Sequence, residues 1–324
     1  MKKTLAFLLG GVLLVAACKK SAGPAEEIQA EESAISQRIC FSNEVLQQQL
    51  QEDPGLADRM AAIERFTQQF VESPESQRLL ANGIIEIPVV FNVLYRTAAQ
   101  NVSLAQLQSQ IDVLNEDYSA TNADYNLTST YQSVKSGDIQ IRFVLDQVIR
   151  KQTNKTSWTT NNAMKKSAQG GINPTSPTTK LNIWVCNMGG GILGYAQFPG
   201  GASSTDGVVL DDNATGRTGT AAAPFNKGRT ATHEVGHWLN LRHIWGDATC
   251  GNDQVGDTPL HNTANYGCPA AGHKSTCTGT PVEMTMNYMD YSDDACMYMF
   301  SLGQKSRMLA TFATGGPRNS FAQP

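Results

Sequence analysis

Three histidines and a glutamate lie close together in the chain and have the spacing of a metal site. In the segment 229–247, RTATHEVGHWLNLRHIWGD, His233 and His237 are four residues apart, so a helix would place both imidazoles on one face. Glu234 follows the first histidine and is close enough to reach a water molecule on the metal. The chain has only five histidines, and chance rarely groups three of them so tightly. The pattern predicts a zinc site with Glu234 as general base.

His243, the third histidine, indicates that the site is catalytic. It lies six residues beyond His237, so the chain must turn near Asn240, a residue type that tolerates left-handed backbone angles. Three histidine ligands leave the fourth position of tetrahedral zinc for water, as in catalytic sites. Zinc lowers the pKa of water toward about 7, and Glu234 would pass a proton to the leaving amine. The alternative is a helix with incidental surface histidines.

A second segment, residues 286–291, reads MNYMDY and follows the third histidine. A methionine turn beneath the zinc ligands is found at such a position in metzincins, and Met289 is its natural candidate. The thioether would form an apolar floor under the site. Tyr291, two residues later, could donate a hydrogen bond to a developing oxyanion. Ordinary core packing of Met289 is the alternative.

These segments, together with CGNDQVGDTP at 250–259 and MNYMDYSDDACMYMFS at 286–301, resemble the pappalysin family of metzincin peptidases, in its small microbial branch. The resemblance extends from about residue 40 to residue 315. One departure is Asn240, where the family usually has glycine. The resemblance implies a zinc endopeptidase that cleaves proteins or peptides, with a preference for Arg or Lys on the primed side of the scissile bond.

The resemblance also implies further site residues. Asp293 and Asp294 could form a negative pocket floor, although both could instead be solvated or bind an ion. Bound calcium is implied as well, since three residues after the third histidine offer the oxygen ligands that Ca²⁺ prefers, although capping or turn roles also suit them. These three are Asp253, Asp257 and Thr258, and the family pattern pairs Cys250 with Cys277 and Cys268 with Cys296.

Cys40 precedes the expected catalytic domain. In related zymogens a prosegment cysteine occupies the fourth zinc position, and Cys40 is placed to do the same. The alternatives are a Cys40–Cys186 disulfide or two buried thiols, because Cys186 lies in an apolar strand. Activation would need a cut after Cys40, near Arg59 or Arg65. The expected domains are a signal peptide at 1–17, a tether and inhibitory prosegment at 18–59, and a catalytic domain at 60–324.

The first residues have the features of an export signal. Lys2 and Lys3 precede the short apolar run Leu5–Val15, which is too short for a stable membrane span. Cys18 follows Val15-Ala16-Ala17, as in a bacterial lipobox, so we expect it to be lipidated after cleavage. An ordinary signal peptide with an incidental cysteine is the alternative. We expect an outer-membrane lipoprotein, or a form released outside the cell by activation, whose membrane contact is the Cys18 lipid alone.

Helices and strands must position these residues. Helical spacing is found at 40–52, 56–72, 103–118 and 302–312, and strand patterns at 84–94, 139–149, 181–186, 193–198 and 208–210. The expected order is strand, helix, strand, helix, strands, helix. This predicts an α/β (α+β) metzincin-like fold: an upper twisted mixed sheet with a backing helix and an active-site helix, above an irregular, disulfide-pinned lower subdomain at 244–300.

Composition narrows the function further. The net charge is −4 and no basic stripe stands out, so nucleic acid is not an expected partner. Two other functions fit a zinc-binding scaffold: a surface-anchored binding protein without chemistry, and a zinc hydrolase of non-peptide amides. Glu234 argues against the first, because a binding-only zinc site needs no base. The methionine-turn segment and the family resemblance favour peptides over other amides.

Overall fold

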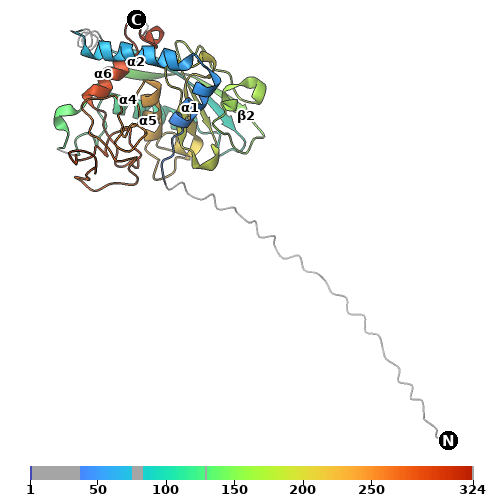
Figure 1. Ribbon diagram of the computed structural model, residues 1–324. Coiled ribbons are helices and arrows are strands. Elements are labelled where there is room, and N and C mark those ends of the chain that lie inside the picture. The colour runs from blue at the N-terminus through green and yellow to red at the C-terminus, as the bar shows by residue number, and fades with distance from the viewer. Residues whose placement is uncertain (2–36, 75–82, 128–129, 323–324) are drawn as a thin grey trace. The chain divides into compact units, whose positions relative to one another are not determined.

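A five-stranded sheet forms the centre of the compact unit that begins at Ile35. The computed structural model describes Met1 and residues 37–74, 83–127 and 130–322. The strand order is β2-β1-β3-β5-β4, and Figure 1 labels the edge strand β2 and the helices of the compact unit. Neighbouring strands are parallel except for β4, which pairs antiparallel with β5 and forms one edge of the sheet. The strands are β1 (Ile85–Tyr95), β2 (Ile141–Gln152), β3 (Leu181–Cys186), β4 (Gly194–Ala196) and β5 (Val208–Asp211).

The central strands are apolar on both faces. All six residues of β3 are buried, and β1 is buried from Val89 to Leu94. Near-continuous β-branched and aromatic runs of this kind are typical of parallel strands that are covered on both sides. The five strand patterns in the sequence therefore correspond to the five observed strands. The mixed α/β fold expected from the sequence is confirmed.

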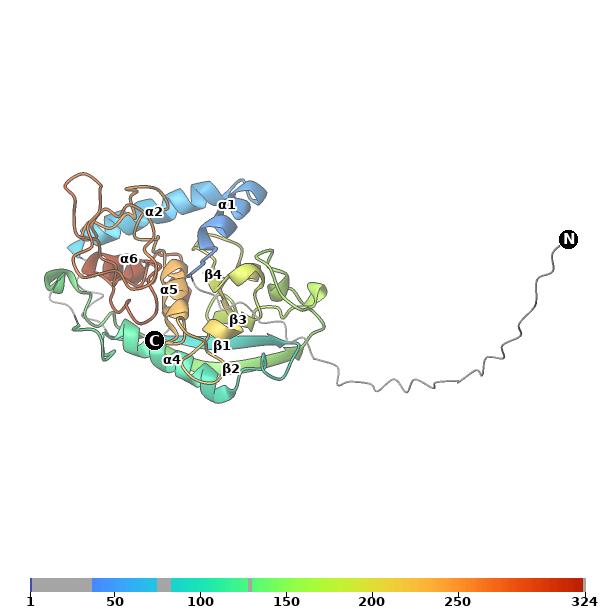
Figure 2. The same cartoon turned by 90° about the horizontal axis from the view of Figure 1, so that it is seen from below.

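Two helices pack against the sheet and carry or support the candidate site. Helix α4 (Leu104–Tyr118) begins at Ser103, whose side chain accepts a hydrogen bond from the Gln106 amide at 3.1 Å. It runs alongside β1 and β2 (Figure 2). Helix α5 (Arg229–Trp238) lies on the side of α4 that faces the remaining helices (Figure 2). All ten residues of α5 are buried. A short helix this enclosed holds its side chains in fixed positions.

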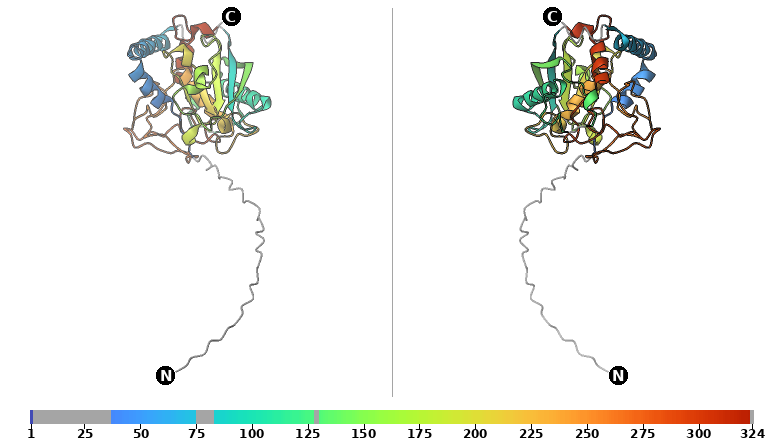
Figure 3. Two further views of the ribbon diagram at one scale, coloured as in Figure 1. Left: turned by 90° about the vertical axis from the view of Figure 1, so that its right-hand side faces the viewer. Right: turned by 90° about the vertical axis from the view of Figure 1, so that its left-hand side faces the viewer.

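Three further helices lie on the other side of α5. Helices α1 (Ser42–Glu52) and α2 (Leu56–Glu72) are on the opposite side of the compact unit from α4 (Figure 3), and α2 passes across α6 (Leu302–Ala310). Glu64 of α2 accepts two hydrogen bonds of 2.8 Å from Arg307 of α6. Helix α2 is continuous through Arg59 and Arg65, so the expected domain boundary between residues 59 and 60 falls inside it.

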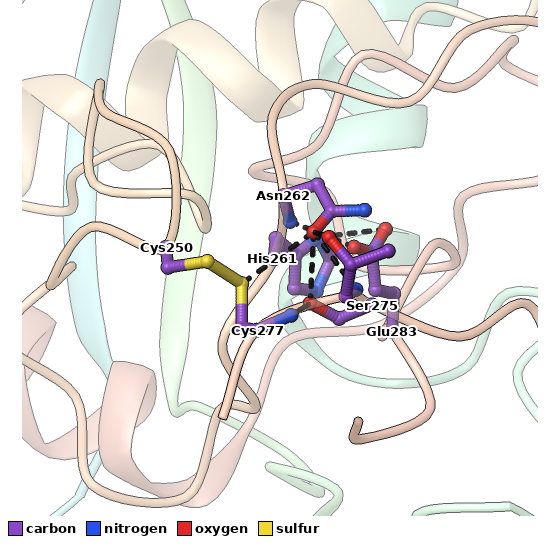
Figure 4. The surroundings of a disulfide bond; sticks show 7 residues. Cys250, His261, Asn262, Ser275, Cys277 and Glu283 are labelled. Carbon is purple, nitrogen blue, oxygen red and sulfur yellow. Dashed lines mark hydrogen bonds and ion pairs between the residues drawn. A yellow bond between two sulfur atoms is a disulfide. The ribbon is translucent and has the colours of Figure 1, made fainter. Parts of the chain in front are cut away.

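Residues 244–300, all described, contain no helix or extended strand. Both disulfides implied by the family resemblance are present, with Cα atoms 5.7 Å apart for Cys250–Cys277 and 5.5 Å apart for Cys268–Cys296. Beside the first bridge, the Ser275 hydroxyl donates to the Asn262 side-chain oxygen at 3.2 Å (Figure 4). The Thr276 amide donates to the same oxygen at 2.9 Å. Disulfides and side-chain hydrogen bonds thus replace the backbone ladders of the upper half.

The expected helix between the second and third strands is absent. Residues 153–180 are all described and contain only two one-turn 3₁₀ helices, Ala163–Lys165 and Ser167–Gln169. This segment is rich in Ser, Thr, Asn and Gly, which favour turns over helix interiors. Within the described residues, no helix has the length and apolarity needed to cross a membrane.

Candidate active site and metal centre

His233, His237 and His243 converge on one point inside the protein. The Nε2 atom of His237 lies 3.2 Å from that of His233 and 3.1 Å from that of His243. The first two histidines are one turn apart on α5. The third returns to them because Asn240 adopts a left-handed conformation, with φ of 70°. The structure therefore has the turn that was expected near Asn240, although the family usually has glycine at this position.

The opposite ring nitrogen of each histidine has a partner that fixes the orientation of the ring. Nδ1 lies 2.6 Å from the Tyr288 carbonyl in His233, 2.8 Å from the Leu241 carbonyl in His237 and 2.5 Å from the Asp247 carboxylate in His243. Carbonyl oxygens only accept, so Nδ1 carries the proton in the first two rings. The Nε2 lone pairs are left to face each other, an arrangement typical of metal-binding histidines.

The electrostatics of the cluster suit a cation. Burial, together with the neighbouring His243, lowers the pKa of His237 to about 3, and burial also lowers the pKa of His233. Neutral imidazoles have the lone pairs that a metal needs. Zinc–nitrogen bonds of about 2.0–2.1 Å in a tetrahedron would separate the nitrogens by about 3.3 Å, close to the observed spacings. The donor set therefore fits zinc.

Met289 lies under the histidine helix at Gly236. A Cβ atom at Gly236 would approach the Met289 sulfur to 2.5 Å, so any side chain there would displace the methionine. Met289 is fully buried, and its backbone carbonyl accepts a hydrogen bond from the Ile244 amide at 3.1 Å. The geometry matches a methionine turn beneath the site. Gly236 was not singled out from the sequence, because its partner lies 53 residues away.

Tyr291 stands beside the histidines on the same segment. Its ring centroid is 5.0 Å from that of His243 and 5.7 Å from that of His233. Burial raises the pKa of Tyr291, and the nearby Cys40 and Glu234 raise it further. The phenol therefore keeps its proton and can donate a hydrogen bond. It donates to the Cys40 carbonyl at 3.0 Å.

Two residues near the N-terminus contact Glu234. The Ser42 hydroxyl donates to Oε2 of Glu234 at 2.8 Å, and the Cys40 sulfur lies 3.4 Å from the same oxygen. Burial raises the pKa of Glu234 to about 7, although both hydrogen bonds lower it. The Cys40 sulfur and one ring nitrogen of each of the three histidines also lie within 4.8 Å of one another, so these four residues could together hold a metal ion. Cys40 and Cys186 are both free thiols, so the alternative Cys40–Cys186 disulfide is not formed.

The chain around Cys40 is held along the edge of the sheet. Leu193 donates its amide to the Ile39 carbonyl at 3.0 Å, and Phe41 donates to the Gly194 carbonyl at 3.2 Å. The Cys40–Gly194 bridge is parallel. The edge of the sheet at Leu193 and Gly194 therefore binds an extended segment that belongs to this chain.

Arg38 occupies a closed, negatively charged pocket next to this segment. Its Nη2 lies 2.6 Å from Oδ1 of Asp294, its Nη1 donates to the Thr230 hydroxyl at 3.1 Å and its Nε donates to the Ser292 carbonyl at 3.3 Å. Both charged side chains are almost fully buried. Of the expected acidic pair, Asp294 contacts Arg38, whereas Asp293 is partly exposed and its backbone amide donates to Gly267.

The expected calcium residues are divided between two sites. Thr258 Oγ1 lies 3.0 and 2.8 Å from the two carboxylate oxygens of Asp253, and 3.0 Å from the Val255 carbonyl. Asp257 instead accepts from the Ser301 hydroxyl and the Gly303 amide, at 2.6 and 2.8 Å, which caps the start of α6. The alternative capping role is thus observed for Asp257.

Comparisons with known proteins agree with this geometry. The model of the peptidase family described as pregnancy-associated plasma protein-A matches residues 178–313. An extracellular metalloprotease of Verticillium alfalfae is 35% identical over 69% of this chain and 77% of its own length. Extracellular metalloprotease 1 of Coccidioides posadasii is 32% identical over 69% and 75%.

Solved structures give the same answer. Mature mirolysin of Tannerella forsythia, in complex with a cleaved peptide, is 43% identical over 74% of this chain and 96% of its own, with a TM-score of 0.71. A promirolysin mutant is 39% identical over 88% of this chain and 97% of its own, with a TM-score of 0.79. Fold and site together define a zinc metallopeptidase of the metzincin type. The chain belongs to the pappalysin family.

Proposed function

We propose that this chain is the latent form of a secreted zinc endopeptidase that prefers basic residues. The observation that carries the proposal is the placement of Arg38, Cys40 and Ser42. Arg38 lies in the acidic pocket, Cys40 lies at the metal centre and Ser42 donates a hydrogen bond to the general base. An enzyme that binds its own chain in this way is adapted to extended peptides, which favours a peptidase over a binding protein or an amidase of small molecules.

The reaction follows from the positions of three groups. Zinc held by His233, His237 and His243 would lower the pKa of a water molecule toward about 7 and polarise the scissile carbonyl. Glu234 would accept a proton from that water and deliver it to the leaving nitrogen. The Tyr291 hydroxyl would donate a hydrogen bond to the substrate oxygen on which negative charge develops. In the latent chain Tyr291 already donates to a peptide carbonyl, that of Cys40.

Latency would come from blocking the water and the base together. Thiolate sulfur binds zinc at about 2.3 Å, so Cys40 would take the position that water needs. Ser42 adds a second block, because its hydroxyl occupies the oxygen of Glu234 that must accept the proton. Arg38 anchors the segment through a buried, charge-assisted hydrogen bond, which contributes about 1.5–3 kcal/mol.

The pocket explains the proposed preference for basic residues. Arg38 stands in for a substrate side chain. Its planar guanidinium uses three nitrogens on three different acceptors, and the ring of Phe225 lies 5.1 Å from its central carbon. A lysine ammonium has a single nitrogen and cannot reach all three. We therefore expect arginine to be preferred over lysine.

Activation must remove the segment that carries these residues. Arg59 and Arg65 both lie within α2, so a cut at either needs local unfolding of the helix. The promirolysin match covers 88% of this chain and the mature mirolysin match 74%. That difference is similar in length to the described chain before β1. We propose that α1 and α2 leave together with Arg38 and Cys40.

The proposal also covers the export of the enzyme and its release from the membrane. The two curated relatives are named extracellular, which supports export of this chain. The proposed signal peptide and the lipid site at Cys18 lie outside the described residues, and an activating cut would release the enzyme from that lipid. Mature enzyme still joined to Cys18 would refute release.

Calcium at Asp253 is proposed because one Thr258 hydroxyl hydrogen cannot serve three surrounding oxygens, whereas a cation could bind them all.

The latency proposal can be tested on the full-length chain. We expect the unprocessed protein to be silent on an arginine-containing peptide, and Cys40→Ala and Arg38→Ala to raise basal cleavage about 10-fold to 100-fold, the effect of losing one charge-assisted contact. Arg59→Ala is the matched control, because Arg59 belongs to the same segment but bonds to Gly200 and Asp53 outside the site. Equal silence in all four proteins, with zinc bound, would contradict the proposal.

A further inference from the structure

Asp117 is a buried carboxylate in α4 that touches no reacting group. Its side chain is 1% exposed. Oδ1 accepts a hydrogen bond of 2.6 Å from the Tyr288 hydroxyl, and Oδ2 accepts one of 2.7 Å from the Thr232 hydroxyl. The two donors come from segments 56 residues apart in the chain. Asp117 therefore joins two pieces of structure that have no shared secondary structure.

Each donor residue is linked to His233, one of the three histidines of the metal centre. Thr232 precedes His233 on α5. Tyr288 precedes Met289, and its carbonyl oxygen lies 2.6 Å from Nδ1 of His233. A closed path thus runs from Asp117 through Tyr288 to the His233 ring, and back along α5 through Thr232. Any movement of Tyr288 relative to α5 would rotate the imidazole.

The charge of Asp117 is balanced within the same group. Nη2 of Arg229 lies 3.6 Å from Oδ1 of Asp117. Arg229 also donates to Asp124 at 2.5 Å and to the Asp294 carbonyl at 2.7 Å. A buried carboxylate without such a partner would be strongly destabilising. The network therefore keeps two acceptor oxygens available for two hydroxyl donors, which an amide of the same size cannot offer.

We propose that Asp117 is a positioning residue that sets the orientation of the His233 imidazole by fixing α5 against the segment that carries Met289. The inference rests on the proposed role of His233 as a zinc ligand. A residue that only fills space would affect stability but would leave metal affinity unchanged. Partners of this kind, one step removed from the metal, change affinity or activity by about 10-fold to 100-fold when they are replaced.

The test uses Asp117→Asn and Tyr288→Phe in the full-length chain, with Tyr118→Phe as control. Tyr118 is the next residue on the same helix, and its hydroxyl lies 3.3 Å from the Thr232 carbonyl, so the control removes a bond to α5 alone. Zinc affinity is measured by competition with a chelator, and melting temperature by circular dichroism. We expect both test variants to bind zinc about 10-fold to 100-fold more weakly, and Tyr118→Phe to bind it as the parent does.

The double variant Asp117→Asn/Tyr288→Phe separates positioning from general loosening. If the two residues act through one path, the double variant should bind zinc no more weakly than the single variant with the lower zinc affinity. Parental zinc affinity in both single variants would overturn the inference. Tyr288→Phe keeps the buried charge pair, so it remains informative if Asp117→Asn does not fold. Failure of the parent itself to bind zinc would instead refute the proposed function.

Discussion

The two halves of the enzyme are stabilised in different ways and supply one site in nearly equal parts. The half that contains the sheet has five hydrogen-bonded strands with α4 and α5 packed on them. The half at residues 244–300 has no helix or extended strand and is held by two disulfides. The first supplies His233, Glu234 and His237. The second supplies Met289, Tyr291 and Asp294, and His243 lies just before it.

This difference shows that catalytic geometry does not require regular structure around every group. The sheet half holds its residues through backbone ladders, which fail together when the fold melts. The loop half holds them through separate contacts, such as Tyr288 to Asp117 and Met289 to Gly236. We therefore expect damage to the sheet half to lower global stability, and damage to the loop half to lower activity before the fold is lost.

The largest expected effect comes from removing a histidine from either side of the turn at Asn240. His237→Ala and His243→Ala should each abolish stable zinc binding and lower kcat/KM by about 10³-fold or more, because several kcal/mol of electrostatic stabilisation is lost. Metal content and peptide cleavage of the activated enzyme measure both. Clearly weaker loss in His243→Ala would show that the loop contribution is secondary.

Removing the Cys250–Cys277 disulfide should destabilise the loop half. The bridge closes a loop with a sequence separation of 27, for which the chain-entropy estimate is about 3.5 kcal/mol. In the double serine variant, we expect activity to fall on heating before the far-ultraviolet circular dichroism of the sheet and helices changes. Simultaneous loss of both signals would show that the two halves unfold as one.

A cavity in the sheet half is the matching experiment. Ile183 in β3 is fully buried, and Ile183→Ala should cost about 3 kcal/mol through lost burial and the cavity left behind. Here we expect activity and circular dichroism to be lost at the same, lower temperature, with kcat near the parental value below it. Early loss of activity in this variant as well would remove the proposed contrast between the halves.

The sequence predicted most of the sheet half and little of the long-range contacts in the site. The bounds of α2 and β3 agree with the expected ranges, because apolar periodicity is a local signal. The missing helix at 153–180 shows the limit of this reasoning where polar residues dominate. The disulfide pairings could be expected only from the family resemblance, since four cysteines allow three pairings.

Contacts between distant residues left no signal in the pattern. Arg38 meets Asp294 across 256 residues, and Ser42 meets Glu234 across 192. Neither Arg38 nor Ser42 belongs to a recognisable motif, and each is a common surface type. Only the folded chain shows that Arg38 contacts Asp294 and that Ser42 contacts Glu234. The convergence of the three histidines was predictable because the motif fixes helix and turn within eleven residues.

Specificity for arginine should depend mainly on Asp294, which belongs to the loop half. Asp294→Asn removes the negative charge under Arg38 and should raise KM for arginine peptides about 10-fold to 100-fold, as expected for a charge-assisted hydrogen bond. Steady-state kinetics of the activated enzyme measures this change. Asp293→Asn is the matched control, because Asp293 is partly exposed and Arg38 forms its ion pair with Asp294 instead. Equal effects of the two variants would contradict a pocket centred on Asp294.

The smallest expected effect is that of calcium on the loop half. If Ca²⁺ binds near Asp253 and is present at about ten times its Kd, chelation should destabilise the enzyme by about 1.4 kcal/mol. Differential scanning fluorimetry with a calcium-selective chelator measures this shift. The Asp253→Asn variant should not respond to the chelator. An identical response in the variant would place any bound calcium elsewhere.

Cleavage-site profiling on a peptide library tests the central claim most directly. Activated enzyme, freed of its prosegment and loaded with zinc, is compared with Glu234→Ala. The account predicts that only the parent cuts, that it cuts next to arginine more often than next to lysine, and that the variant still binds zinc. Silence of both zinc-loaded proteins, or cleavage by the variant at the parental rate, would contradict the account.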